Sequence, residues 1–169
     1  PNLLTLRPCD AVETAECWQL ALQTSTGPSI LALTRQKLKP ARLTYSAKNL
    51  CALGAYEITP STKKSKVVIF ASGSEVEIAI EAKATLDKAG TPTRVVSVPS
   101  MELFEKQSKA YKKKLLGTEK TRIAIEAGVV QGWNRFIGND GVFIGMKGFG
   151  ASAPAEALYK HFGITAKAA

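Results

Sequence analysis

Residues 67–90 have the sequence VVIFASGSEVEIAIEAKATLDKAG, which changes its periodicity halfway along. The first six residues are apolar or small and rich in β-branched side chains, which favours a buried strand. From Ser74 onward the apolar residues recur with helical spacing, and Gly90 follows where a helix commonly ends. We therefore predict a strand over 67–72 that leads directly into a helix over 74–89.

The same order of strand and helix repeats on the C-terminal side of this stretch. Apolar runs predict three more strands, at 93–98, 122–127 and 142–146. Helical patterns occupy the segments between and after them, at 102–116, 129–137 and 154–162. Such a repeat produces parallel strands with helices on both faces. The predicted fold class is α/β, a three-layer αβα arrangement around a mostly parallel sheet.

One further strand is expected before this repeat. The apolar run 50–58 is joined to the strand at 67–72 by the turn-like segment 60–66, PSTKKSK. A short turn joins antiparallel neighbours more readily than parallel ones. We expect this strand to be an antiparallel edge, which makes the sheet mixed.

The first 44 residues form a smaller pattern of their own. Strands are predicted at 3–6 and 29–33 around a helix over 10–23, which begins with Asp10 and Glu13 at the spacing of a capping box. One face of that helix carries Ala11, Ala15, Trp18 and Leu22. A βαβ-like unit of about 40 residues cannot bury both faces of a parallel pair by itself. We interpret it as a remnant of another α/β domain.

A basic, aperiodic segment containing Pro40 connects the two patterns over residues 36–49. Such a composition is typical of a surface connection. The expected division is 1–44 for the end of one domain and its linker, and 45–169 for a second α/β domain. The sequence begins with neither Met nor a signal peptide, so we expect a fragment of a longer protein.

The composition narrows the classes of function. No run approaches the roughly 20 apolar residues of a membrane helix, and the three cysteines, with one histidine, lack zinc-site spacing and are expected to be reduced and buried. The net charge of +9 raises the possibility of nucleic-acid binding, but a solvated surface is the preferred interpretation because no RNA-binding aromatic signature is interleaved. The clustered lysines are Lys63, Lys64, Lys66, Lys106, Lys109, Lys112, Lys113 and Lys114.

Two strand ends are candidate sites with structural alternatives. The segment 70–77 runs from a strand through Gly73 into a helix start, where phosphates can bind, but Ser74 and Glu77 have capping-box spacing and no nucleotide motif is present. Glu126 ends a predicted strand, where carboxylates often face ligand crevices. Capping of a following helix is the preferred interpretation of Glu126.

The C-terminal segment favours structural roles. Gly145, Gly148 and Gly150 permit a tightly folded loop, and Ser152 is expected to cap the last helix. His161 lies in that amphipathic helix, where an exposed position is expected, so a catalytic triad is excluded.

Arg35 is the remaining candidate. It follows the apolar run 29–33, and the ends of parallel strands carry ligand-binding groups in α/β sheets. Its planar guanidinium can bind a phosphate in bidentate fashion. From spacing alone, a salt bridge to a carboxylate at a domain boundary is at least as good an interpretation.

Over nearly all of its length the chain resembles the C-terminal portion of the transketolase family. The resemblance rests on ordered motifs: LRPCDAVETAECWQLAL, GPSILALTRQ, FASGSEVEIAIEA, RVVSVPSMELFEKQ, IAIEAG and GMKGFGASAPAEALYKHFG. It implies a thiamine diphosphate enzyme with three α/β domains, Mg²⁺ or Ca²⁺, and a homodimer holding the cofactor between subunits. Two-carbon ketol units pass between sugar phosphates in the pentose phosphate pathway. The implied compartment is the cytoplasm, or a plastid in a photosynthetic eukaryote.

On this resemblance, residues 1 to about 44 end the pyrimidine-binding domain and the rest forms the C-terminal domain. Arg35 matches the family's substrate-binding arginine, which holds the sugar-phosphate group at the mouth of the active-site channel. The family's G-D-G metal motif is missing from the sequence. The activating glutamate and the substrate-contacting histidines belong to the missing N-terminal and middle domains. The fragment alone is therefore expected to be inactive, with no catalytic, cofactor or metal-binding residues and with neither nucleic acid nor membrane as a partner.

Two alternatives stay open at this point. Dihydroxyacetone synthase and deoxyxylulose phosphate synthase share the architecture that the resemblance implies. The chain could also serve purely as a structural or dimerisation module.

Overall fold

The strands and helices form two sheets with helices packed around them. The protein is described by a computed structural model that covers residues 2–169. The elements, in chain order, are β1 (Leu4–Leu6), α1 (Ala11–Gln23), β2 (Ser29–Leu31), η1 (Cys51–Leu53), β3 (Tyr56–Thr59), β4 (Val67–Ala71), α2 (Glu75–Lys88), β5 (Thr93–Ser97), α3 (Met101–Glu105), α4 (Lys109–Leu116), β6 (Thr121–Glu126), α5 (Asn134–Ile137), β7 (Val142–Gly145), α6 (Ala155–Phe162) and η2 (Ala166–Ala168).

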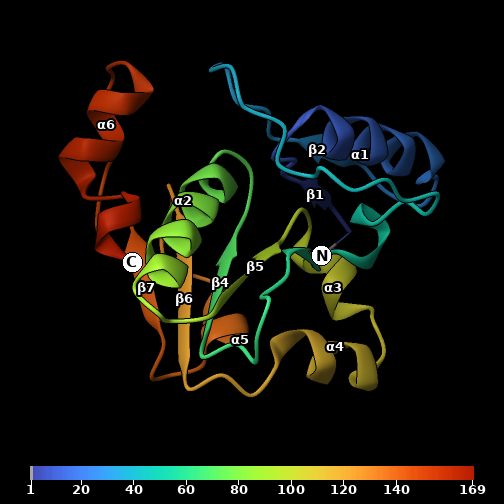
Figure 1. Cartoon of the computed structure of the whole chain (residues 1–169). Coiled ribbons are helices and arrows are strands. Elements are labelled where there is room, and N and C mark those ends of the chain that lie inside the picture. Colours follow the sequence, from blue (N-terminus) through green and yellow to red (C-terminus); the bar gives the residue numbers. More distant parts are fainter. Residues whose placement is uncertain (1) are drawn as a thin grey trace.

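The larger sheet has the strand order β3-β5-β4-β6-β7. β3 pairs with β5 antiparallel at one edge, and all other pairs in this sheet are parallel. The mixed sheet with an antiparallel edge strand is therefore confirmed, although β3 pairs with β5 and not with β4, the strand that the turn 60–66 leads into. A separate two-stranded parallel sheet joins β1 to β2. Figure 1 shows β1, α1 and β2 together on one side of the molecule and α6 on the other.

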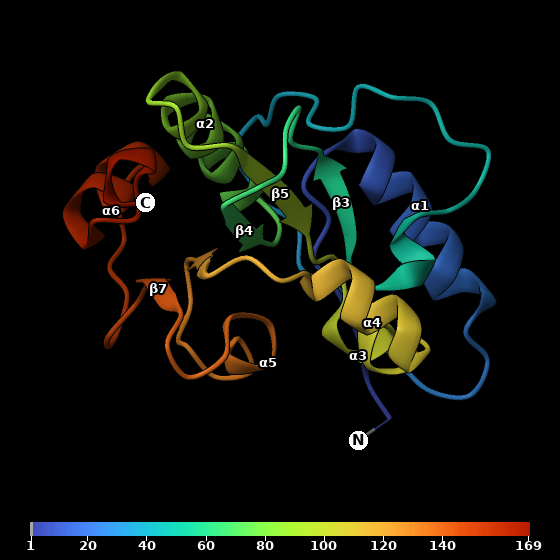
Figure 2. The same ribbon diagram turned by 60° about the horizontal axis from the view of Figure 1, so that its bottom comes forward.

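Helices cover both faces of the five-stranded sheet and create a core on each. On one face α2 packs its small side chains, such as Val76 and Ala79, against Ile69 and Ile125. On the other face the aromatic rings of α3 and α5 pack against Phe70, with centroids of Phe104 and Phe136 4.9 Å apart. Figure 2 shows α2 and α5 on opposite sides of the strands. The three-layer αβα prediction is confirmed.

The strand predicted over 50–58 is shorter and begins later. Residues 51–53 form the 3-10 turn η1, and Gly54 follows with a φ of 73°. A Cβ at Gly54 would lie 2.0 Å from the amide nitrogen of Phe104, so this close approach requires glycine. The chain therefore turns at Gly54 before β3 starts.

Two predicted helices also have different bounds. The helix expected over 102–116 divides into α3 and α4, because the hydroxyls of Ser100 and Ser108 each cap a new helix by accepting a backbone N–H three residues ahead. The helix expected over 129–137 is confined to α5, and a loop precedes it. Within residues 2–169 no helix is both long and apolar enough to cross a membrane.

The helix caps were predicted with mixed success. Asp10 caps α1 as expected and accepts the Glu13 amide at 2.8 Å, whereas Glu13 accepts the Cys9 amide instead of reaching Asp10. The Ser74–Glu77 capping box was wrong. Ser74 has helical backbone angles and caps nothing, and Glu77 pairs with Lys39 at 2.8 Å.

The last cap prediction, for the C-terminal helix, was also wrong. Ser152 does not cap α6, because Pro154 occupies that position. Proline fixes its own φ and has no backbone N–H, so it suits a helix start without a side-chain bond.

A buried carboxylate attaches α1 to the larger sheet. Glu13 is fully buried, and besides the Cys9 amide it accepts hydrogen bonds from the hydroxyls of Tyr56 on β3 and Ser97 on β5, both at 2.7 Å. Burial raises the pKa of Glu13, against the lowering effect of these bonds. The helix face with Trp18 and Leu22 points the other way and is exposed.

Replacing Glu13 should test this attachment. Glu13→Ala leaves three buried donors without an acceptor, and each such group costs about 1–3 kcal/mol. We expect the free energy of unfolding to fall by at least about 3 kcal/mol in a urea titration. Glu81→Ala, an exposed position on α2, is the matched control and should change it by less than about 0.5 kcal/mol. An equal decrease in the free energy of unfolding for both variants would show that the hydrogen bonds of Glu13 do not stabilise the fold.

Candidate functional site

Polar side chains gather where three strands of the two sheets end. Arg7 follows β1, Ser72 follows β4, and Glu126 is the last residue of β6. The backbone of Arg7 is fixed on both sides, since its N–H donates to the Pro99 carbonyl at 2.8 Å and its carbonyl accepts the Gly73 N–H at 3.1 Å. The β1 unit is thereby held against the carboxyl edge of the larger sheet.

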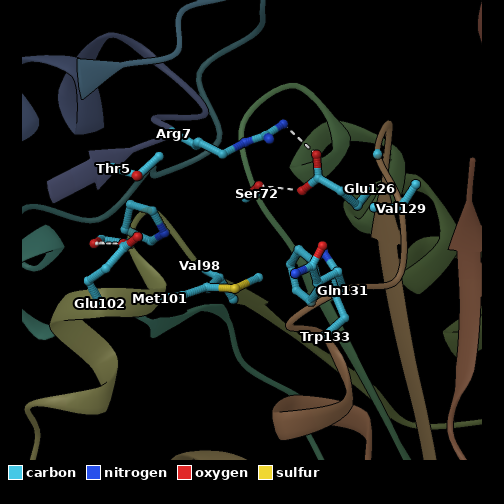
Figure 3. Close-up of a pocket in the computed structure, with 13 residues that line it drawn as sticks. Thr5, Arg7, Ser72, Val98, Met101, Glu102, Glu126, Val129, Gln131 and Trp133 are labelled. Carbon is cyan, nitrogen blue, oxygen red and sulfur yellow. Dashed lines mark hydrogen bonds and ion pairs between the residues drawn. The ribbon is translucent and has the colours of Figure 1, made fainter. Parts of the chain in front are cut away.

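The side chains of these residues form one hydrogen-bonded cluster. One carboxyl oxygen of Glu126 accepts from the Arg7 guanidinium, and the other shares a hydrogen bond of 2.6 Å with the Ser72 hydroxyl. Glu75, in the first turn of α2, lies 3.7 Å from Arg7. The Tyr159 hydroxyl on α6 donates to Glu75 at 2.5 Å. The cluster therefore joins β1, the sheet, α2 and α6 (Figure 3 shows Arg7, Ser72 and Glu126).

The buried cluster changes the acidity of Glu126. Burial, followed by the negative charge of Glu75, raises the pKa of Glu126 to about 8, although Arg7 and Ser72 act in the opposite direction. A carboxyl group with this pKa keeps its proton at neutral pH. Burial and Glu75 also raise the pKa of the Tyr159 hydroxyl, which therefore stays a hydrogen-bond donor.

A cavity of about 370 Å³ opens in front of this cluster. Its polar lining includes Arg7, Ser72, Ser100, Glu126 and Gln131. Val98, Met101 and Trp133 provide an apolar part of the wall. Figure 3 shows Arg7 and Glu126 facing each other across the upper part of the cavity, with Met101, Gln131 and Trp133 below them.

Arg35 lies apart from that cavity. β2 ends at Leu31, two residues earlier than predicted, so Arg35 sits in an exposed bend instead of at the strand end. Its neighbours Thr34 and Gln36 line a smaller cavity of about 220 Å³ together with Asp10. Among residues 2–169 no carboxylate lies within ion-pair distance of Arg35.

The structure also places the other residues that the sequence singled out, namely Glu126, His161 and the three cysteines. Glu126 does not cap a helix, because the chain forms a loop after β6 and α5 begins only at Asn134. His161 is exposed on α6, as expected. All three cysteines are free and buried, also as expected. Within the described part of the chain, no group of three or more His, Cys, Asp or Glu side chains is placed to hold a metal ion.

Arg7 is the site residue that sequence reasoning missed. Its signal was available, because it follows the predicted strand 3–6 in the same way that Arg35 follows the strand at 29–33. Its partner Glu126 is 119 residues away along the chain. No local spacing indicates such a pair.

The chain matches known proteins over nearly its whole length. Residues 54–165 match the family model for the transketolase-like TK C-terminal domain. The chain is 50% identical to a transketolase of Rhodobacter capsulatus over 99% of its own length and 26% of the relative. It is 52% identical to a transketolase of Sinorhizobium medicae, covering 98% of itself and 24% of that protein.

Solved structures agree with these sequence matches. The transketolase structure from Leishmania mexicana superimposes with a TM-score of 0.88 at 38% identity, over 99% of this chain and 24% of that one. The Campylobacter jejuni transketolase structure gives 0.86 at 37% identity, over 99% of this chain and 25% of that one. The chain thus spans about a quarter of the length of the relatives it matches.

The raised pKa of Glu126 predicts a pH-dependent stability. Between pH 4.5, its ordinary pKa, and about 8, the folded protein keeps a proton that the unfolded chain releases. The contribution of Glu126 to stability is therefore complete below pH 4.5 and is lost as the pH rises through this window, by up to about 1.4 kcal/mol per pH unit. Glu126→Gln is permanently neutral, so its stability relative to wild type should increase with pH.

Urea titrations of both proteins at about pH 5 and about pH 8.5 measure this difference. Glu81→Gln, at the exposed position on α2, is the control and should show the same difference at both pH values. A constant difference for Glu126→Gln as well would contradict the protonated state of Glu126.

Proposed function

Because the chain belongs to the transketolase family, we propose that it forms the C-terminal part of a thiamine-diphosphate-dependent enzyme that transfers two-carbon ketol units between sugar phosphates. The observation that carries the proposal is the roughly 50% identity to curated transketolases over 98–99% of the chain. The activity belongs to the longer protein, in which a homodimer with Mg²⁺ or Ca²⁺ holds the cofactor. The proposed pathway is the pentose phosphate pathway, and the proposed compartment is the cytoplasm.

We propose that parts of the longer protein outside this chain hold the cofactor. A diphosphate is held in this family through a divalent metal, and residues 2–169 offer no cluster of ligands for one. We therefore derive no chemical step through the cofactor from this chain. Its proposed contribution is a substrate contact at Arg35 and a folded domain that supports the remainder of the protein.

The alternatives have less support. The relatives from Rhodobacter capsulatus and Sinorhizobium medicae are both named transketolase, and neither dihydroxyacetone synthase nor deoxyxylulose phosphate synthase is favoured by them. A purely structural module remains distinguishable by experiment, because it predicts that no substitution in this chain alters substrate preference.

A chimera provides the direct test of function. The matching segment of the Rhodobacter capsulatus transketolase is replaced by this chain, and ketol transfer from xylulose 5-phosphate to ribose 5-phosphate is assayed with thiamine diphosphate and Mg²⁺. The proposal expects transfer activity. A folded, dimeric chimera that uses formaldehyde or pyruvate instead would favour one of the related enzymes.

Arg35→Ala in the chimera should lower kcat/KM for phosphorylated substrates and leave kcat/KM for unphosphorylated substrates nearly unchanged. Arg35 is exposed and without an ion-pair partner within residues 2–169, so its guanidinium is free to receive a phosphate. A charge-assisted hydrogen bond is worth about 1.5–3 kcal/mol, which corresponds to a loss of roughly 10- to 150-fold in kcat/KM. Arg35→Lys should rescue this loss only partly, because an ammonium cannot bind in bidentate fashion.

The kinetics are measured on a ketose phosphate and on its dephosphorylated analogue. Lys37→Ala, which removes an exposed charge two residues away, is the matched control and should affect neither substrate strongly. If Arg35→Ala lowers kcat/KM equally for both substrates, Arg35 does not bind the phosphate group.

We also propose that residues 1–44 end the pyrimidine-binding domain and that 45–169 form the C-terminal domain. The connection between them is anchored at two places, where Asp10 accepts the amides of Ala41 and Arg42, and where Glu16 accepts the Cys51 amide. Limited trypsin digestion should therefore cut after the exposed Lys37 and Lys48 before the buried Arg42, whereas the bond after Lys39 is resistant because Pro40 follows it. Mass spectrometry identifies the cuts, and resistance at both Lys37 and Lys48 would show that the two parts behave as one unit.

A further inference from the structure

The cavity beside Arg7 lies at the switch point of the larger sheet. The chain leaves β4 through α2 on one face, towards β5, and leaves β6 through α5 on the other face, towards β7. Where adjacent parallel strands send their connections to opposite faces, a crevice forms outside their carboxyl ends, and α/β proteins bind ligands there. Ser72 and Glu126 mark this crevice, because they follow or end β4 and β6.

The cluster in the crevice has unused hydrogen-bonding capacity. The Nε atom of Arg7 is buried and has no hydrogen-bond partner, and the same is true of one carboxylate oxygen of Glu75. A buried donor without a partner is costly, so an oxygen atom from a ligand at this position would be stabilising. The Arg7 side chain is still 40% exposed, which leaves it accessible from the cavity.

The charges around Arg7 decide which class of ligand fits. Glu75 opposes the positive charge of Arg7, and Glu126 keeps a proton at neutral pH because its pKa is about 8. Glu102 is exposed at the wall of the same cavity and adds one negative charge. Among the lining residues, the positive charge of Arg7 is thus balanced by the negative charge of Glu102, so the cavity offers neither an anion nor a cation a net opposite charge.

A neutral molecule with many hydroxyl groups suits both the unused hydrogen-bonding capacity of the cluster and the charges around Arg7. Each hydroxyl can accept a hydrogen bond from Arg7 and donate one to a carboxylate. The amide of Gln131 can do the same, while Met101 and Val98 offer an apolar surface to carbon atoms. The volume of about 370 Å³ lies within the range of small-ligand pockets.

We propose that this cavity is a binding site for a small neutral polyol of monosaccharide size. Arg7 and Glu126 anchor its hydroxyl groups, and Gln131 contacts it from the opposite wall. The site is separate from Arg35 and requires neither the cofactor nor the parts of the enzyme beyond this chain. Loss of ketol transfer in the chimera would leave it unaffected.

The test uses the complete 169-residue chain labelled with ¹⁵N. D-Ribose and ribitol are titrated while backbone amide shifts are recorded, and inorganic phosphate serves as the anionic probe. We expect saturable shifts with a dissociation constant of about 1–10 mM, largest at Gly128, Val129 and Met101, and no saturable shift there with phosphate. No saturation by about 100 mM polyol, or saturation at another surface, would overturn the proposal. Binding of phosphate in place of the polyols would overturn the assigned ligand class.

Two variants connect the binding to its proposed contacts. Arg7→Gln should weaken polyol binding at least about 10-fold, and Gln131→Ala at least about threefold, because each removes hydrogen bonds to the ligand. Gln131 is exposed, so its variant keeps the test valid even where Arg7→Gln fails to fold. Arg135→Gln and Gln36→Ala, outside the cavity lining, are the matched controls and should bind as wild type does. Unchanged binding by Gln131→Ala and Arg7→Gln would contradict the proposed site.

Discussion

The fold depends on placing one carboxylate, that of Glu13, out of contact with water. A buried carboxyl group without partners would be strongly destabilising, so Glu13 requires its three donors at the same time. They come from the segment before α1, from Tyr56 on β3 and from Ser97 on β5. The small β1–β2 unit can therefore be correctly packed only when the antiparallel edge of the larger sheet has formed.

This requirement determines the position of Arg7. The chain from β1 to α1 is short, so the attachment of α1 at Glu13 holds the intervening residues against the carboxyl edge of the sheet. Arg7 then lies opposite Glu126, and the backbone bonds to Pro99 and Gly73 leave it little freedom. A polar crevice at the switch point is thus shaped by an arginine from outside the sheet. The protonation of Glu126 in this crevice depends on both of its charged neighbours, because Glu75 raises the pKa of Glu126 and Arg7 lowers it.

The sequence predicted the features that depend on local periodicity. The strand at 67–72, the helix that Gly90 follows and the alternation that produces the three layers arise from residues that are neighbours in the chain. The antiparallel edge was also predicted, although its pairing is not local, because β3 pairs with β5 and not with β4, the next strand along the chain. The predictions from sequence were wrong where a polar side chain could form its hydrogen bond or ion pair with more than one partner. Ser74 and Glu77 have the spacing of a capping box, yet tertiary contacts with Tyr159 and Lys39 prevail. The Arg7–Glu126 pair has no local signature, because only the folded sheet brings these residues together.

Arg7 and Arg35 follow adjacent parallel strands but meet different physical conditions. Arg7 directly follows β1, in the crevice between the two sheets, where carboxylates and backbone groups hold it. β2 ends early, so Arg35 is carried four residues past the last paired position into an exposed bend. A guanidinium that must bind and release a phosphate in each turnover benefits from having no competing carboxylate, because an ion pair would have to break first. The two arginines therefore suit different ligands, with Arg7 held in place in the crevice to offer hydrogen bonds to a neutral polyol and Arg35 available for exchange with a phosphate.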